Sequence, residues 1–134
     1  LTFFMPLLLG TGGNTGSQAA TLVVRALSTD DLDLSDWMRA IGKELFVGCV
    51  LGAAMGLCTS LLGFWRGDWH LALAVALSMA AIVVWANLMG AVLPFVLMRF
   101  KMDPAVASSP LITSVSDVTG LVIYFWIARA VMEF

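Results

Sequence analysis

Charged residues are scarce in this sequence. Asp, Glu, Lys and Arg make up 12% of the 134 residues, about half the share found in an average soluble domain. Hydrophobic residues make up 60%, and the mean hydropathy is +0.96. Seven basic residues against nine acidic ones provide no basic face for nucleic acid. The composition therefore predicts a protein of the lipid bilayer that binds no nucleic acid.

Residues that carry enzyme chemistry are equally few. The two cysteines, Cys49 and Cys58, are nine positions apart in one apolar run, about 13 Å along a helix, which is too far for a disulfide. The one histidine, His70, lies at a segment end. The sequence has no metal–thiolate pattern, no phosphate-binding loop and no Ser/His/Asp set inside an apolar run. We expect neither enzyme activity nor a bound cofactor.

Four apolar segments are long enough to cross a membrane, since a crossing helix needs about 20 residues. They span about residues 1–27, 37–65, 71–98 and 105–131. Backbone groups in hydrocarbon must be satisfied internally, which favours helices over strands. The sequence therefore predicts an all-α membrane protein with four transmembrane segments in a single domain, residues 1–134. Trp37, Trp65 and Trp69 lie at segment ends, as is typical of an aromatic belt.

Lys and Arg counts in short loops predict the orientation in the membrane. Five basic residues lie near the ends on one side and two near the ends on the other: Arg25, Arg39, Lys43, Arg99 and Lys101 against Arg66 and Arg129. We expect the loops at 28–36 and 99–104 in the cytoplasm. Both ends of the chain, the C-terminus included, then lie outside the cytoplasm.

Small residues form a ridge on the second segment. Gly48, Gly52 and Gly56 recur every four residues and so share one helix face. Such ridges let helix backbones approach closely in lipid, which favours a helix–helix or dimer contact. The alternative is that glycine is simply common in membrane helices.

Asp117 is the acidic residue that lies deepest in an apolar run. A charge at that depth costs at least about 2.5–3.5 kcal/mol, so such residues face a water-filled path or a partner. No Lys or Arg lies near the middle of any segment to pair with it. Thr113, Ser116 and Gly120 share its helix face, and each hydroxyl could also bond to its own backbone. We predict a functional role for Asp117, with Thr113 and Ser116 beside it.

Glycines also crowd the first segment, at Gly10, Gly12, Gly13 and Gly16. Each weakens a helix by about 1 kcal/mol, so we expect a break there whose freed carbonyls bind a cation or its water shell. The alternative is close helix packing through glycine. Asn14 lies about 20 Å from the cytoplasmic end of its segment and Asp117 about 18 Å from the same side. This equal depth predicts one site, with Asn14 as a side-chain oxygen donor.

The third segment contributes Asn87 and Pro94. Asn87 is expected to form a hydrogen bond to another helix, and such a bond contributes about 0.6–2 kcal/mol in lipid. Pro94 is expected to kink or end the regular helix.

Two stretches carry a family resemblance. Residues 6–18, PLLLGTGGNTGSQ, resemble the motif P-x-x-x-G-x-G-G-N-x-G-x-Q of the MgtE family of magnesium transporters. Residues 103–117, DPAVASSPLITSVSD, resemble that family's motif D-P-A-x-A-S-x-P-x-x-T-x-x-x-D, and Arg25 matches an Arg that follows the first motif. The resemblance covers essentially the whole chain.

The resemblance implies a homodimer with five transmembrane helices per subunit in the cell (inner) membrane and an ion path along the subunit interface. It also implies a cytosolic regulatory region with a CBS pair that senses magnesium. On this reading the chain corresponds to the second through fifth helices, and the regulatory region and the first helix are absent. The pore carboxylate maps onto Asp117, and the polar, glycine-rich helix maps onto Gly10 through Gln18.

Transport of Mg²⁺ is thus the leading hypothesis, because Mg²⁺ keeps several waters that one carboxylate per subunit and neutral oxygens could hold. Mn²⁺ and Co²⁺ are alternative ions. The other hypotheses are a small proton-coupled multidrug exporter that uses one membrane carboxylate, and a scaffold held by the glycine ridge. The exporter leaves the glycine-rich helix unexplained, and the scaffold leaves Asp117 unexplained.

Overall fold

The computed structural model describes residues 2–65, 68–107 and 109–132 as an all-helical chain. Four long helices are present: α1 (Met5–Ser28), α2 (Trp37–Trp65), α3 (Trp69–Arg99) and α4 (Ser109–Met132). Short 3₁₀ turns, Thr2–Phe4, Leu34–Asp36 and Pro104–Val106, precede α1, α2 and α4. The four segments read from hydropathy match these helices to within a few residues, because long apolar runs in lipid must be helical.

Three of the helices are long and apolar enough to span a membrane: residues 34–65, 69–99 and 109–132. The protein is therefore a multi-pass membrane protein. α1 has 24 residues, as many as α4. It falls outside this group because Thr, Asn, Ser and Gln side chains interrupt its apolar surface. The prediction of four helices is confirmed, with α1 the most polar of them.

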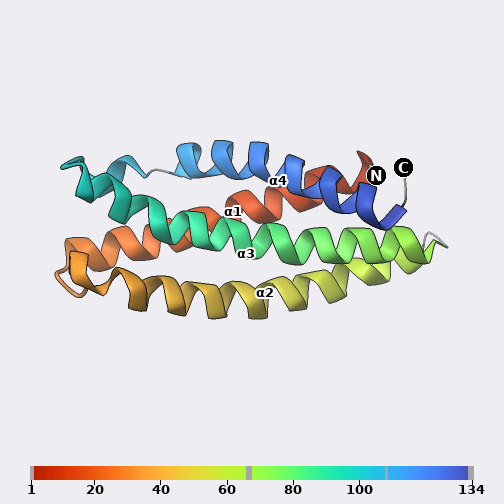
Figure 1. Cartoon of the computed structure of the whole chain (residues 1–134), viewed down its shortest axis with the longest axis horizontal. Coiled ribbons are helices and arrows are strands. Elements are labelled where there is room, and N and C mark those ends of the chain that lie inside the picture. Colours follow the sequence, from red (N-terminus) through yellow and green to blue (C-terminus); the bar gives the residue numbers. More distant parts are fainter. Residues whose placement is uncertain (1, 66–67, 108, 133–134) are drawn as a thin grey trace.

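α3 is the central helix of the bundle and packs against each of the other three (Figure 1). The two ends of the chain lie at one end of the bundle, and the connections after α1 and α3 lie at the other (Figure 1). This agrees with the predicted grouping of the loops. One residue of that prediction, Arg66, lies outside the described residues.

The apolar core forms two clusters along α3. The first lies toward the chain ends and includes Leu8, Met79, Ile82 and Tyr124. The second lies toward the opposite end and includes Val23, Ala40, Ala91 and Phe95. Dispersion contacts in these clusters hold the helices together, because lipid tails are as apolar as the side chains and provide little hydrophobic drive.

The glycine ridge of α2 is a helix contact within one chain. A methyl group added at Gly52 or at Gly56 would lie 2.9 Å from a backbone carbonyl oxygen of α3, that of Ala80 or Ala76. Gly48 meets Asn87 in the same way, at 3.2 Å from its Cβ. All three glycines therefore pack against α3 within the chain.

The expected break in the first segment is wrong, because α1 is an uninterrupted α-helix from Met5 to Ser28. Its glycines instead permit close packing: Gly12 is buried against Ile82, and the carbonyl of Gly16 touches Gly90 of α3. Tight contacts to neighbouring helices offset the helix-weakening effect of glycine. The carbonyls of Gly12 and Gly13, which were predicted as cation ligands, are therefore not freed by a break in the helix.

Pro94 does not end α3, which continues to Arg99. Proline removes one backbone donor but is tolerated inside a membrane helix when the surroundings satisfy the freed carbonyl or the helix bends.

Candidate cation site

The two polar stretches of the sequence meet where α1 crosses α4. A methyl group added at Gly13 would lie 3.5 Å from Oδ1 of Asp117 and 2.9 Å from Cγ2 of Thr113. The bare backbone of Gly13 is what lets the α4 carboxylate approach α1. The two stretches therefore lie at the same level along the bundle.

Ser17 extends this contact by one helical turn. Its hydroxyl lies 3.2 Å from that of Thr113, and it donates a hydrogen bond to the carbonyl oxygen of Ser109 at 3.4 Å. Sequence reasoning did not name Ser17 as a site residue. The signal was present, because Ser17 lies four positions after Gly13 and so on the same helix face.

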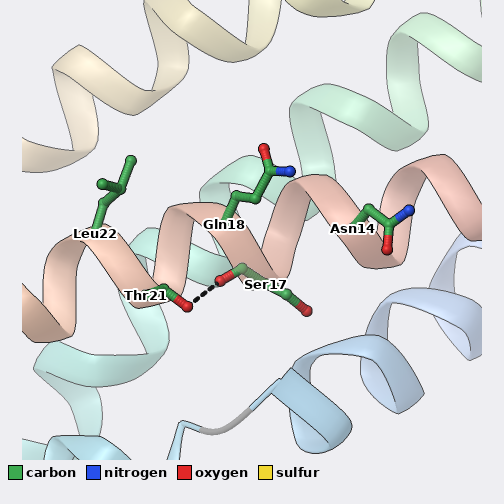
Figure 2. A pocket seen from close by; sticks show the side chains of 5 residues that line it. All are labelled: Asn14, Ser17, Gln18, Thr21 and Leu22. Carbon is green, nitrogen blue, oxygen red and sulfur yellow. Dashed lines mark hydrogen bonds between the residues drawn. The ribbon is translucent and has the colours of Figure 1, made fainter.

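An open groove of about 470 Å³ follows α1 beside this contact. Its lining comes from Asn14, Ser17, Gln18, Thr21 and Leu22 (Figure 2). Figure 2 shows Asn14, Gln18 and Thr21 on successive turns, and the hydroxyl of Thr21 donates to the backbone oxygen of Ser17 at 2.8 Å. Asn14 and Gln18 are exposed although they lie mid-helix. Amide side chains at this depth require water or another polar surface.

The carboxylate of Asp117 is partly buried. No described side chain forms an ion pair or a hydrogen bond with it. Among the described residues, the one contact between a basic and an acidic side chain joins His70 Nδ1 to Asp68 at 3.8 Å, at the start of α3. The described residues also contain no group of three His, Cys, Asp or Glu side chains placed to hold a metal. One chain thus offers a single carboxylate with neutral oxygens around it, a donor set suited to a cation that keeps its water.

Ser116 is buried in the packed contact between α4 and α1, one helical turn along α1 from Gly13. Its hydroxyl would lie 3.1 Å from a methyl group at Gly16 and has no hydrogen-bond partner among the described residues. The structure thus brings Asp117, Thr113, Gly13 and Asn14 to one region, and it buries Ser116 against Gly16 beside them. The role of Ser116 as an ion ligand stays a prediction.

A second intramembrane carboxylate, Glu44, was not singled out from the sequence. Glu44 is only 7% exposed, and Asn87 of α3 donates to its backbone oxygen at 2.6 Å and to its Oε2 at 3.0 Å. This confirms that Asn87 bonds across to another helix. The available signal was position, because Glu44 lies four residues before Gly48 on the face that packs against α3.

Similarity to known proteins assigns the chain to a family. The sequence profile of the MgtE family, described as a divalent cation transporter, matches residues 5–127. The chain belongs to the MgtE family. Among individual relatives, the magnesium transporter MgtE of Thermus thermophilus is 50% identical over 133 residues, which is 99% of this chain and 30% of the relative.

Two further MgtE relatives match at lower identity. The magnesium transporter MgtE of Bacillus subtilis is 36% identical over 97% of this chain and 29% of its own length. That of Enterococcus faecalis is 37% identical over 100% of this chain and 30% of its own length. This MgtE chain therefore spans about 30% of the length of these relatives.

Proposed function

We propose that this chain forms the ion-conducting part of a magnesium transporter. The observation that carries the proposal is the unpaired carboxylate of Asp117 against the bare backbone of Gly13, at membrane depth beside a polar groove. A membrane carboxylate without a basic partner is a functional site by default, because its charge is too costly to keep for packing alone. The relatives are named magnesium transporters, which supports magnesium as the ion.

The ion would remain hydrated in this site. Mg²⁺ gives up its water reluctantly and is typically bound through one or two carboxylates and its own waters. Asp117 supplies the charge, and Asn14, Thr113 and Ser17 supply neutral oxygens for the water shell. Mn²⁺ and Co²⁺ have similar charge and size and would compete for the same site.

We further propose that the path is completed by a second copy of the chain. Asn14 and Gln18 are exposed on α1, and one chain provides one carboxylate at this depth. A twofold axis beside α1 and α4 would face the two grooves toward each other and bring two Asp117 side chains to one ion. The loops at 28–36 and 99–104 would lie in the cytoplasm, with both chain ends outside, in the cell membrane.

The exporter hypothesis has less support. Proton-coupled export could use Asp117, but it gives no role to the exposed amides of Asn14 and Gln18. The relatives are all named magnesium transporters.

The test is Mg²⁺ flux into liposomes that contain the complete protein. Asp117→Asn keeps the shape and hydrogen bonding of the side chain and removes its charge, so we expect flux to be abolished while the dimer stays intact. Asp30→Asn is a matched control, because Asp30 is exposed in a loop with φ of 57°, a conformation that Asn accepts. Near-normal flux of Asp117→Asn would refute the role of the charge.

A further inference from the structure

A second groove lies at the end of the bundle opposite the chain termini, between the start of α2 and the end of α3. It has a volume of about 490 Å³ and is lined by Leu34, Trp37, Ile41, Val92, Phe95 and Arg99. We refer to it as the Arg99 trough. Its lining is apolar except for Arg99, and it is separate from the site at Asp117.

The trough opens at the ends of two candidate membrane spans, residues 34–65 and 69–99, and runs inward along them. Arg99 is the last residue of α3 and Trp37 the first of α2. Val92 lies seven residues before Arg99, about 10 Å deeper along the helix. Trp37 is 49% exposed at the rim, where tryptophan occupies the headgroup level of a bilayer. The trough therefore has a polar mouth and an apolar floor. A phospholipid has the same arrangement, with a polar headgroup at the surface and apolar chains below it.

The charge at the mouth is positive and unpaired. Arg99 is exposed, and no described acidic side chain forms an ion pair with it. Asp36 precedes Trp37 in the sequence, but its carboxylate accepts a hydrogen bond from the backbone N–H of Asp33 at 3.0 Å. Asp36 lines a different groove, together with Arg39 and Lys43. Among the residues that line the trough, Arg99 carries the one charge.

We propose that the Arg99 trough binds an anionic phospholipid, with its phosphate on the guanidinium of Arg99 and the upper part of its acyl chains on Leu34, Val92 and Phe95. Basic pockets between membrane helices near a bilayer surface are typical sites for anionic headgroups. The planar guanidinium suits a phosphate because it can donate two parallel hydrogen bonds. This proposal depends on the membrane arrangement of α2 and α3 and not on the ion path.

Native mass spectrometry of the complete protein in detergent tests it with phosphatidylglycerol and phosphatidylcholine as probes. We expect phosphatidylglycerol to be retained more strongly, and Arg99→Gln to weaken its binding about fivefold. Arg129→Gln is the matched control, because Arg129 is also exposed in the last turn of a helix but lies at the opposite end of the bundle. It should leave binding unchanged.

A second variant tests the apolar lining. Leu34 is 48% exposed, so Leu34→Ser should fold normally while it weakens phosphatidylglycerol binding. It also decides the matter if Arg99→Gln fails to fold. Soluble glycerol phosphate should not displace the lipid at equal concentration, since it lacks the chains. Equal retention of the two lipids, or unchanged binding in both trough variants, would overturn the proposal and leave a protein segment as the occupant of the trough. Displacement by glycerol phosphate would overturn it in favour of a plain phosphate site.

Discussion

Replacement of Gly16 by alanine should loosen the packing of α1 against the rest of the bundle. A methyl group there would lie 2.9 Å from the backbone oxygen of Ala86, 2.9 Å from Cγ2 of Ile112 and 3.1 Å from Oγ of Ser116. Ordinary carbon contacts are about 3.5–4.0 Å. The carbonyl of Ala86 belongs to the helix and cannot rotate away, so α1 must shift by several tenths of an ångström.

The magnitude follows from comparison with Gly10, which lies on the same helix with no atom within 4 Å of an added methyl group. Both substitutions gain the same helix propensity, about 1 kcal/mol. Gly10→Ala should therefore stabilise the protein, whereas Gly16→Ala adds an overpacking cost of about 1–3 kcal/mol. The difference between the two free energies of unfolding isolates that packing cost.

Reversible unfolding in mixed detergent micelles, followed by circular dichroism, measures this difference. Gly16→Ala should unfold at a lower denaturant fraction than Gly10→Ala by an amount that corresponds to about 1–3 kcal/mol. Equal stability of the two variants would refute the reasoning, because it would mean that α1 does not pack through Gly16 and that the glycines serve a break in the helix after all.

Two further predictions concern the site and the α2–α3 contact. Gly13→Ala places a methyl group 2.9 Å from Thr113 and 3.5 Å from the Asp117 carboxylate, so it should reduce Mg²⁺ flux in liposomes, while Gly10→Ala retains it; equal flux would remove Gly13 from the site. Asn87→Leu removes the donor that Asn87 offers to the buried carboxylate of Glu44, which should lower the free energy of unfolding by about 1–3 kcal/mol. Glu44→Gln keeps an acceptor for Asn87 and should cost less; a larger loss in Glu44→Gln would show that the charge, not the hydrogen bond, holds the helices together.

The helices could be predicted from the sequence because an apolar run in lipid must satisfy its backbone hydrogen bonds within the segment, which favours a helix. The boundaries of α2 agree with the predicted 37–65, and those of α3 agree to within two residues. The equal depth of Asn14 and Asp117 could be predicted too, since it depends only on the fixed rise of a helix.

Two features of the structure were not predicted from the sequence. Glycine content predicted a break in α1. The low helix propensity of Gly12, Gly13 and Gly16 is instead offset by close contacts with Ile82, Thr113 and Ile112 on other helices, and the local pattern does not reveal these contacts. Glu44 escaped notice because it lies close to a segment end, and its partner Asn87 is 43 positions away. Both errors come from contacts between helices, which propensity and hydropathy do not encode.

A hydrated Mg²⁺ in the groove beside Asp117 should protect a cysteine placed at position 18 from chemical modification. Gln18 lines the groove and is exposed. Gln18→Cys is made in the complete protein after Cys49 and Cys58, both exposed, are replaced by alanine. A positively charged, membrane-impermeant thiol reagent should modify this cysteine, millimolar Mg²⁺ should slow the reaction, and Asp117→Asn should abolish the slowing. A cysteine that is inert to the reagent, or one whose reaction rate ignores Mg²⁺, would contradict the account.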